Sequence, residues 1–413
     1  MACTSKVLRH EKQNHSKRDL EMRRDNQVIS VKVDNFKSLV DFEFDLSGFT
    51  CLVGYNGAGK STILQLFDFI ASLFQGSTER WLKMRNWKAT DLTFKPSRKQ
   101  SISLRLIFRI GNNYYFWIAK FNRTKMTCTY EHISRSEPTG AVKLFEATDK
   151  GYRLYESETK SVDFNYIGTI LSQIKPEVLG PELTLIRNFI SGFRSLDLLA
   201  PNLIREKSRA GELPDIGLGG EKLSAFLHGL PAEDRTSIVN DLRRYYPQLI
   251  NIHTASVAGG WIKVEIEEAI SGNETFKTEA RHINDGFMRL LAISAQRFST
   301  NTFLLYDEIE NGVNPEVAQI LVDALVESPK QTLVTTHSPV VLNFLKDELA
   351  RKAVVFVYKR DDGVTRAIRL FDAPTALKKL DFLSPGEVMI DIPHAVIAQE
   401  AEEILLAKAN TPK

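Results

Sequence analysis

Apolar and polar residues alternate through much of the first half of the chain. Alternation over 28–33 and 42–46 predicts two strands, and the same pattern returns in 101–108 and 114–118. Strands with one apolar and one polar face are typical of antiparallel sheets. We therefore expect an antiparallel β layer from Ser101 to about Tyr155, beside a second sheet.

Three short runs combine apolar residues with threonine and contain no charged residue, namely 49–53, 302–306 and 332–335. Continuous runs of this length are typical of strands that are buried on both faces. Apolar residues at helical spacing predict a helix over 62–73 and a largely helical segment over 165–250. Together these patterns predict an α/β protein with a mixed sheet core, an antiparallel β layer and a helical lobe.

The remainder of the chain predicts a hairpin around Gly259-Gly260, a helix over 286–295 and two short strands within 353–371. Residues 378–393 are expected to be a linker. An amphipathic helix is predicted over 395–407, and it either docks a partner or packs on its own domain. No heptad pattern lasts long enough for a coiled-coil arm.

We therefore expect three parts. Residues 1–26 are polar and mixed in charge, which is typical of a flexible extension, and a basic arm that touches nucleic acid is the alternative. Residues 27–377 form one domain, with the helical lobe inserted at about 165–300. Residues 378–413 supply the linker and the last helix, a candidate element for docking a partner.

Composition changes this picture little, but it excludes several classes of protein and of metal site. In the 413 residues the net charge is +3, which is too small by itself to indicate nucleic-acid binding. Three cysteines without a CxxC pair exclude a disulfide framework and a cysteine zinc site. No apolar run approaches the ~18 residues that cross a bilayer, and the N-terminus lacks the apolar segment of a secretion signal. We expect a cytoplasmic protein without a membrane partner.

A glycine-rich loop lies between the first apolar run and the helix that follows it. Its sequence is Gly54-Tyr55-Asn56-Gly57-Ala58-Gly59-Lys60-Ser61. Glycines let successive backbone N–H groups point at phosphate oxygens, the lysine reaches the β- and γ-phosphates, and the serine hydroxyl contacts Mg²⁺. The strand–loop–helix context favours ATP and Mg²⁺ binding over an incidental glycine turn. The expected nucleotide-binding residues are Asn56, Gly57, Ala58, Gly59, Lys60, Ser61 and Thr62.

Two adjacent carboxylates, Asp307 and Glu308, end the second apolar run. Alternation along a strand sends neighbouring side chains to opposite sides. Asp307 can then contact Mg²⁺ together with Ser61, while Glu308 polarises the attacking water. Surface acids at a strand end are the alternative interpretation.

His337 follows the third apolar run, in the segment Thr335-Thr336-His337-Ser338-Pro339. A single histidine is usually structural or solvated. Here its position just downstream of the acidic pair is that of a group that contacts the γ-phosphate and senses its loss. We predict Glu308 and His337 as the catalytic residues.

These motifs, in this order, resemble the head of an ABC-type ATPase. Asp307-Glu308-Ile309-Glu310-Asn311-Gly312-Val313-Asn314-Pro315 is similar to the D-E-x-E-N-G-x-x-P stretch of RecF/OLD-like ATPases, often called AAA-type ATP-binding proteins. The opening Asp34-Asn35-Phe36-Lys37-Ser38-Leu39 also resembles their first strand and turn. The resemblance spans Val28 to about Phe371.

The resemblance implies a signature segment at Asn284, Asp285 and Gly286, which would cap the ATP of an opposite protomer. Asn284 replaces the usual serine, and helix capping is the alternative role for this segment. The family also has a glutamine that contacts Mg²⁺. Gln173 is the candidate by chain order, and Gln100 is its rival.

The resemblance also bounds the biological role. OLD-type proteins append a Toprim nuclease domain, but only 76 residues follow His337 (413 minus 337). We therefore expect a stand-alone head that hydrolyses ATP sandwiched between two copies, as a homodimer or a higher homo-oligomer. Its expected role is a switch in a prokaryotic anti-phage defence system, acting on a separate nuclease or toxin effector.

Two alternatives stay open at this point. A RecF-like factor in DNA repair would bind DNA through basic clusters such as 83–88 and 95–99. A scaffold would hold ATP without hydrolysing it.

Overall fold

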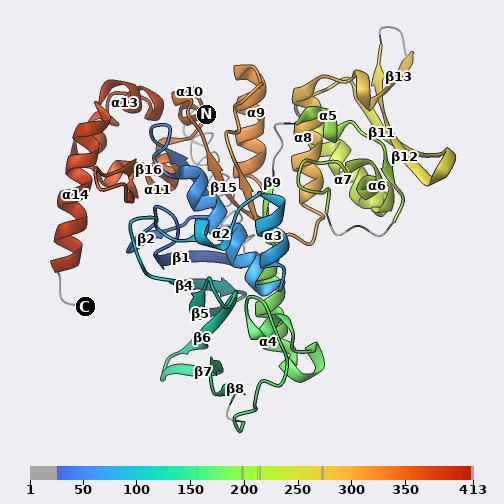
Figure 1. Ribbon diagram of the computed structural model, residues 1–413. Helices are drawn as coiled ribbons and strands as arrows, with labels where there is room; N and C mark the ends of the chain where they lie inside the picture. The colour runs from blue at the N-terminus through green and yellow to red at the C-terminus, as the bar shows by residue number, and fades with distance from the viewer. Residues whose placement is uncertain are drawn as a thin grey trace.

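The computed structural model describes residues 26–155, 157–196, 200–211, 213, 215–270 and 274–410 (Figure 1). The predicted extension 1–26 lies outside the described residues except for Asn26, which begins the first strand.

A seven-stranded antiparallel sheet accounts for the alternating half of the sequence, in the order β2-β1-β4-β5-β6-β7-β8. In β4 and β5, buried positions alternate with more exposed ones, so one face of the sheet packs on the core and the other faces water. The predicted antiparallel layer is confirmed. The strands are β1 (Asn26–Asp34), β2 (Phe42–Asp45), β4 (Ser101–Ile110), β5 (Asn113–Asn122), β6 (Thr127–Glu137), β7 (Gly140–Thr148) and β8 (Gly151–Leu154).

A six-stranded mixed sheet contains the three uncharged runs, and its order is β17-β16-β3-β15-β14-β9. All its pairings are parallel except that of β16 with β17. Every residue of β3, β14 and β15 is buried, as predicted. The strands are β3 (Phe49–Val53), β9 (Phe193–Leu196), β14 (Phe303–Tyr306), β15 (Gln331–Thr335), β16 (Val354–Lys359) and β17 (Thr365–Arg369).

The segment 165–250 is less helical than predicted, because it contains β9, β10 and the start of β11. Strand β9 has four residues and follows a helix almost directly. Four residues are too few for a strand pattern to be told from the end of a helix in the sequence. Pairing with β14 decides the conformation of β9.

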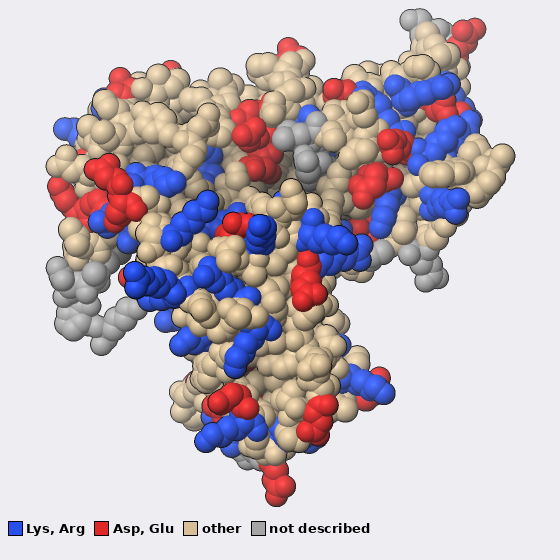
Figure 2. Space-filling view, in the orientation of Figure 1, with Lys and Arg blue, Asp and Glu red and all other residues tan. Residues whose placement is uncertain are grey.

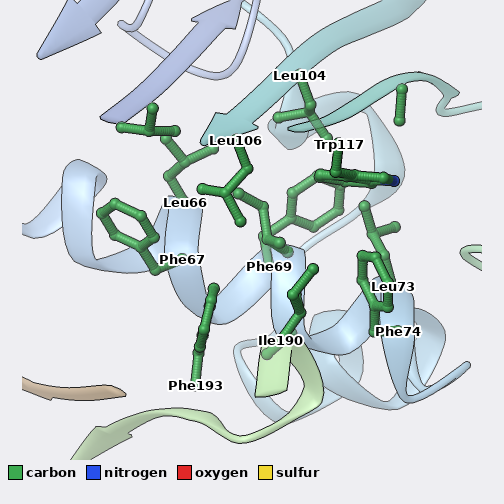
Figure 3. Packing of buried hydrophobic residues seen from close by; sticks show 14 of the residues in the cluster. Leu66, Phe67, Phe69, Leu73, Phe74, Leu104, Leu106, Trp117, Ile190 and Phe193 are labelled. Atoms are coloured by element: carbon green, nitrogen blue, oxygen red, sulfur yellow. The ribbon is translucent and has the colours of Figure 1, made fainter. Parts of the chain in front are cut away.

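Helix α2 (Lys60–Phe74) lies between the two sheets. Figure 3 shows Leu66, Phe67, Phe69, Leu73 and Phe74 among side chains from β4, β5, α4 (Pro176–Ser191) and β9. The contacts are largely aromatic: the rings of Phe74 and Trp117 lie 5.1 Å apart at an edge-on angle, and Phe67 meets Phe303 at 5.1 Å in the same way. Helix α2 is therefore buried almost all round, which fixes the loop that precedes it.

The two sheets are also joined by a buried polar side chain. The amide of Gln331, at the start of β15, accepts from Val28 N at 2.7 Å. Its nitrogen donates to Val28 O at 2.8 Å and to Ser47 O at 3.0 Å. These bonds satisfy backbone groups of β1 that its neighbouring strands leave unpaired at the bulge between Val28 and Ser30.

A second lobe carries a small antiparallel sheet, and the predicted hairpin at Gly259-Gly260 joins two of its strands. This lobe forms the right-hand part of Figure 1. Its strands are β10 (Ser208–Arg209), β11 (Leu249–Val257), β12 (Trp261–Ala269) and β13 (Thr275–Glu279). Its helices are α5 (Pro201–Ile204), α6 (Leu223–Gly229), α7 (Ala232–Arg243) and α8 (Asp285–Gln296).

The segment 378–393, predicted as a linker, is folded. It contains the end of α12 and all of α13, which packs on α10 through Gly386: a Cβ there would lie 2.1 Å from Pro339 O. Its Pro and Gly therefore mark a helix start and a close packing contact. The later helices are α9 (Pro315–Val326), α10 (Pro339–Asn343), α11 (Asp347–Ala353), α12 (Pro374–Lys379), α13 (Pro385–Asp391) and α14 (His394–Asn410).

The remaining elements are short. Helix α3 (Thr78–Met84) follows α2, and single 3₁₀ turns lie at η1 (Ala89–Leu92), η2 (Ile170–Ser172), η3 (Ala258–Gly260), η4 (Ala280–His282) and η5 (Leu370–Asp372). Within the described ranges, no helix combines the length and apolar character needed to span a membrane.

Candidate nucleotide-binding site

The glycine-rich loop connects β3 to α2, and its glycines are required by shape. Gly54 has φ +143°, and a Cβ there would lie 2.0 Å from the carbonyl oxygen of Val357 on β16. Gly59 has φ +112°, and its Cβ would lie 2.3 Å from the Thr365 hydroxyl. Any side chain at these positions would push the loop away from β16 and β17.

The loop presents an anion-binding helix end. Gly59 caps α2 without a side-chain hydrogen bond, and no acidic residue lies in the first turn. The first N–H groups of the helix, at Lys60 and Ser61, therefore face the loop without a carboxylate that competes for them. The Thr365 hydroxyl donates to Ala58 O at 2.8 Å and holds the loop from the β17 side.

Lys60 is buried, with 5% of its surface exposed. Its Nζ donates to Gly54 O at 2.8 Å and to Tyr55 O at 3.1 Å, so the amine lies under the loop. Burial lowers the pKa of Lys60, and the negative charges of Asp307, Glu308 and nearby Glu310 oppose that shift.

The acidic pair follows β14 directly. The Thr335 hydroxyl donates to Asp307 Oδ1 at 2.5 Å, and its oxygen accepts from Glu308 N at 2.8 Å. Glu308 has φ +47°, a left-handed conformation that is uncommon outside glycine. Strained backbone of this kind is concentrated at functional sites.

The His337 ring lies between the Lys60 amine and the Glu308 carboxylate. Its Nδ1 is 3.4 Å from Lys60 Nζ, and its Nε2 is 3.5 Å from Glu308 Oε1. Glu310 holds the backbone here, since its Oε1 accepts from His337 N at 2.6 Å and from Ser338 N at 3.1 Å. Lysine, histidine and glutamate from three parts of the chain thus form one contiguous group.

The oxygen donors near this group suit Mg²⁺. Ser61 is exposed at the start of α2, after β3, and the Asp307 carboxylate is partly exposed after β14, which is separated from β3 by β15 alone. In the described part of the chain, no cluster of three or more His, Cys, Asp and Glu forms a metal cage. Mg²⁺ is usually held by one or two protein oxygens with phosphate and water, and these residues fit that pattern.

The family model described as "AAA domain, putative AbiEii toxin, Type IV TA system" matches residues 49–343, more than half of the chain. The chain belongs to this AAA family. The match begins at β3 and ends in α10, so it includes the glycine loop, the acidic pair and His337. The fold is that of a P-loop ATPase. The narrower resemblance to RecF/OLD-like proteins is not part of this match.

Solved structures with a similar fold are heads of SMC proteins. One is an SMC head bound to the C-winged helix domain of ScpA, with 17% identity, coverage of 83% of this chain and 96% of that one, and a TM-score of 0.49. The SMC head of Thermotoga maritima has 13% identity, coverage of 83% and 98%, and a TM-score of 0.46. A head from Pyrococcus furiosus bound to the C-terminal domain of ScpA has 14% identity, coverage of 86% and 100%, and a TM-score of 0.47. No curated protein matches the chain by sequence.

In this AAA-family chain, Gln173 does not lie at the candidate metal site. It lies beside Gly76, whose Cβ would be 2.7 Å from Gln173 Nε2, just past the C-terminal end of α2. Ser61 is at the other end of that 15-residue helix, about 22 Å away at 1.5 Å per residue. Its rival Gln100 precedes β4 and accepts from the hydroxyl of Thr124, in the turn between β5 and β6. The prediction of Gln173 at the metal site rests on its position before the acids in the chain. The turn at η2 places it at the C-terminal end of α2 instead.

The signature segment lies apart from the loop. Asn284 caps α8, and its side-chain oxygen accepts from Phe287 N at 2.8 Å. Arg205 donates to Ile283 O at 3.1 Å and pairs with Asp285. The segment opens on a separate pocket of about 270 Å³, lined by Tyr246, Gln248, Ile266, Glu268, Thr278, His282, Ile283, Asn284 and Phe287. The predicted capping role of Asn284 is therefore confirmed for its side-chain oxygen. Its side-chain nitrogen is the group that could donate to a ligand.

Sequence reasoning missed several residues around the site. Thr335 and Glu310 hold the acids and the histidine, and Thr365 supports the loop. His394, the first residue of α14, contacts Tyr55 with the ring centroids 4.0 Å apart and the ring planes tilted by 46°. Both rings border a pocket of about 460 Å³, lined by Val53, Gly54, Tyr55, Asn56, Thr336, His337, Ser338, Pro339, Leu342, Met389 and His394. The sequence holds one signal for two of them: Thr335 lies two residues before His337, and Glu310 lies two residues after Glu308.

Proposed function

We propose that the chain binds and hydrolyses ATP with Mg²⁺ at the glycine loop. The observation that carries this proposal is the contiguous group of Lys60, His337 and Glu308, with separations of 3.4 and 3.5 Å. A glycine turn alone would not need a general base and a histidine beside its lysine.

Each residue has a distinct role in this proposal. Asn56–Thr62 cradle the phosphates, and Lys60 swings its amine from the loop carbonyls to the β- and γ-phosphates. Ser61 and Asp307 would hold Mg²⁺, which supplies charge neutralisation when it is bound. Glu308 orients and deprotonates the attacking water, and His337 contacts the γ-phosphate.

Purified protein should release phosphate from ATP only with Mg²⁺. Glu308→Gln keeps the shape of the side chain and removes the base, so it should bind ATP normally and lose turnover. Asp347→Asn, a change in the first turn of α11 away from the site, is the matched control. Equal turnover by Glu308→Gln and the wild type would instead favour an ATP-bound scaffold, the third function considered.

We further propose that ATP is sandwiched between two copies of the head. Asn284 borders its own pocket, and none of Asn284, Asp285 and Gly286 lines the pocket at the glycine loop. The segment would therefore complete that site from a second copy. The donor left on Asn284 after capping would contact a γ-phosphate oxygen of the partner's ATP.

The biological role that we propose is a switch subunit that controls a separate nuclease or toxin effector in anti-phage defence. The family description, which names a toxin of a Type IV TA system, supports this context. Cells that carry the intact gene and its neighbours should resist phage infection, and Lys60→Met in the same locus should abolish resistance. Equal plaque counts for the two strains would contradict the proposal.

A docking surface for that effector is proposed on the C-terminal helices, within 378–413 and the end of α12. Large apolar side chains are exposed there: Leu377 at 40%, Phe382 at 86%, Ile390 at 70%, Val396 at 40% and Leu406 at 61%. Isolated exposed apolar residues are ordinary, but this set lies on three consecutive helices and, for Phe382, on the turn between α12 and α13. Phe382→Asp should reduce co-purification of the effector encoded beside the gene, with ATP hydrolysis unchanged.

The second candidate function is a RecF-like DNA-binding ATPase, and the charge distribution favours it. Figure 2 shows Lys and Arg gathered across the middle of one face, in the region of β1, β2, β4 and α3. Lys83, Lys88, Lys95, Arg98 and Lys99 are exposed. DNA should then bind in a salt-dependent manner and stimulate hydrolysis.

The aromatic residue of that cluster is already engaged. Lys37 Nζ lies 3.2 Å from the centre of the Trp87 ring, and Trp81 packs on it edge-on at 5.4 Å. This leaves phosphate contacts rather than base stacking as the binding mode. An absence of binding at low salt would remove the DNA hypothesis.

A further inference from the structure

A buried hydroxyl lies directly beneath the acidic pair. Thr335, the last residue of β15, has no exposed surface. Its Oγ1 donates to Asp307 Oδ1 and accepts from Glu308 N, and its carbonyl oxygen accepts from Ile309 N at 3.2 Å. One residue of β15 thus binds three consecutive residues after β14.

The direction of these bonds is set by chemistry. A backbone N–H only donates, so the Thr335 oxygen accepts from Glu308 and its single proton is free to go to the Asp307 carboxylate. Valine at this position would leave the Glu308 N–H and one Asp307 lone pair without their partner. Serine would keep both bonds.

The constraint matters because Glu308 has a strained backbone. A non-glycine residue at φ +47° is strained and persists only where its surroundings hold it. The Thr335 bond to the Glu308 N–H acts at that position. It fixes where the Glu308 side chain leaves the backbone, and the bond to Asp307 fixes the carboxylate next to it.

We propose that Thr335 is a positioning residue, whose hydroxyl orients the Asp307 and Glu308 carboxylates for hydrolysis. Thr335 is buried beneath the two acids and acts only through them. This inference rests on the proposed hydrolysis at the glycine loop. It differs from simple strand packing, which would depend on the shape of the side chain rather than on its hydroxyl.

The test compares Thr335→Val, which is nearly the same shape, with Thr335→Ser, which keeps the hydroxyl. Losing an outer partner of a metal ligand typically costs about 10–100-fold in activity or metal affinity. We expect Thr335→Val to lower kcat by about that factor and to need more Mg²⁺ for half-maximal turnover. Its ATP affinity without Mg²⁺ should match the wild type, because Lys60 and the loop are intact. Thr335→Ser should restore most of kcat.

Three results separate the outcomes. Wild-type kcat and Mg²⁺ dependence in Thr335→Val, with Glu308→Gln inactive, would overturn the inference and leave the proposed function standing. Equal losses in the Val and Ser variants, with lowered thermal midpoints, would assign Thr335 to packing and also overturn it. If wild-type protein hydrolyses no ATP, the proposed function fails, and the Mg²⁺ dependence of ATP affinity alone tests the role of Thr335. A shift of this dependence in Thr335→Val but not in Thr335→Ser supports positioning of the acids. No shift in Thr335→Val overturns it.

Discussion

Lys60 Nζ lies 3.4 Å from His337 Nδ1, although the two residues are 277 positions apart. Their strands, β3 and β15, are parallel neighbours, so the segments that follow them emerge at the same sheet edge. The lysine can only donate, so His337 Nδ1 accepts and Nε2 carries a proton toward Glu308. The ring thus links the Lys60 amine to the Glu308 carboxylate.

Replacing Lys60 by Met should weaken ATP binding. Methionine keeps the length of the buried stem and removes the charge, and a hydrogen bond to a charged group contributes about 1.5–3 kcal/mol. We therefore expect ATP affinity to fall by about 10- to 100-fold in a calorimetric titration. Lys352→Met on α11, an exposed lysine, should bind ATP like the wild type. Unchanged affinity in Lys60→Met would contradict phosphate binding at the loop.

Changing Asn284 to Asp should abolish turnover without unfolding α8. Aspartate caps helices as well as asparagine does, so the bond from Phe287 N survives. It removes the amide donor, however, and adds a negative charge facing the partner's phosphate. Asn284→Ser, with a donor and a cap, should stay active. A lower thermal midpoint in Asn284→Asp would point to capping as the main role.

The same variant tests whether the site is shared between copies. Lys60→Met and Asn284→Asp should each be inactive alone. In an equal mixture, half of the dimers combine the two variants, and each mixed dimer keeps one intact site. Activity should then return to roughly a quarter of the wild type if exchange is random, by the symmetry of a two-fold sandwich. A mixture as inactive as its components would exclude a composite site.

Stability should fall as pH rises because of Glu131. This carboxyl is fully buried in β6; burial raises its pKa to about 8, and the hydrogen bond from Ile170 N opposes the shift only in part. The unfolded chain releases this proton near pH 4.5, whereas the folded chain keeps it to about pH 8. Between these pH values the folded state binds more protons than the unfolded state. The contribution of Glu131 to stability is therefore complete below about pH 4.5 and is lost as the pH rises to about 8.

Denaturant unfolding of the wild type and Glu131→Gln at pH 5, 6, 7 and 8 measures this effect. Glutamine keeps an acceptor for Ile170 N and cannot ionise. The variant should lack the part of the slope due to Glu131, up to about 1.4 kcal/mol per pH unit. Glu177→Gln, an exposed position on α4, is the control and should keep the wild-type slope. Parallel curves for wild type and Glu131→Gln would show that Glu131 ionises without penalty.

Replacing Gln331 by Leu should destabilise the contact between the two sheets. It removes three hydrogen bonds and leaves Val28 N, Val28 O and Ser47 O without that partner. Buried groups left unsatisfied cost about 1–3 kcal/mol each, and partial relaxation should limit the loss to about 2–4 kcal/mol. Gln173→Leu at the exposed end of α2 should change unfolding by less than about 0.5 kcal/mol. It should also leave Mg²⁺-dependent turnover intact.

The glycine loop and the buried strands were determined by the sequence alone, because their physics is local. Gly54 to Ser61 is one continuous segment whose backbone freedom, charge and helix start lie within eight residues. The runs of β3, β14 and β15 contain no charged residue, as burial on both faces requires. The acids and the histidine followed, since parallel strands bring their C-terminal ends to one edge.

Only the tertiary structure decided which distant groups touch. Gln173 fits the metal site by chain order, but the length of α2 separates it from Ser61. Strand β9 is too short to have its own pattern and depends on β14. Thr335 and Glu310 look ordinary in the sequence and become important through hydrogen bonds to segments 25 to 30 residues away. Hydrogen bonds between chain-distant residues leave no periodic pattern, because strand register and helix length, not local composition, set which atoms meet.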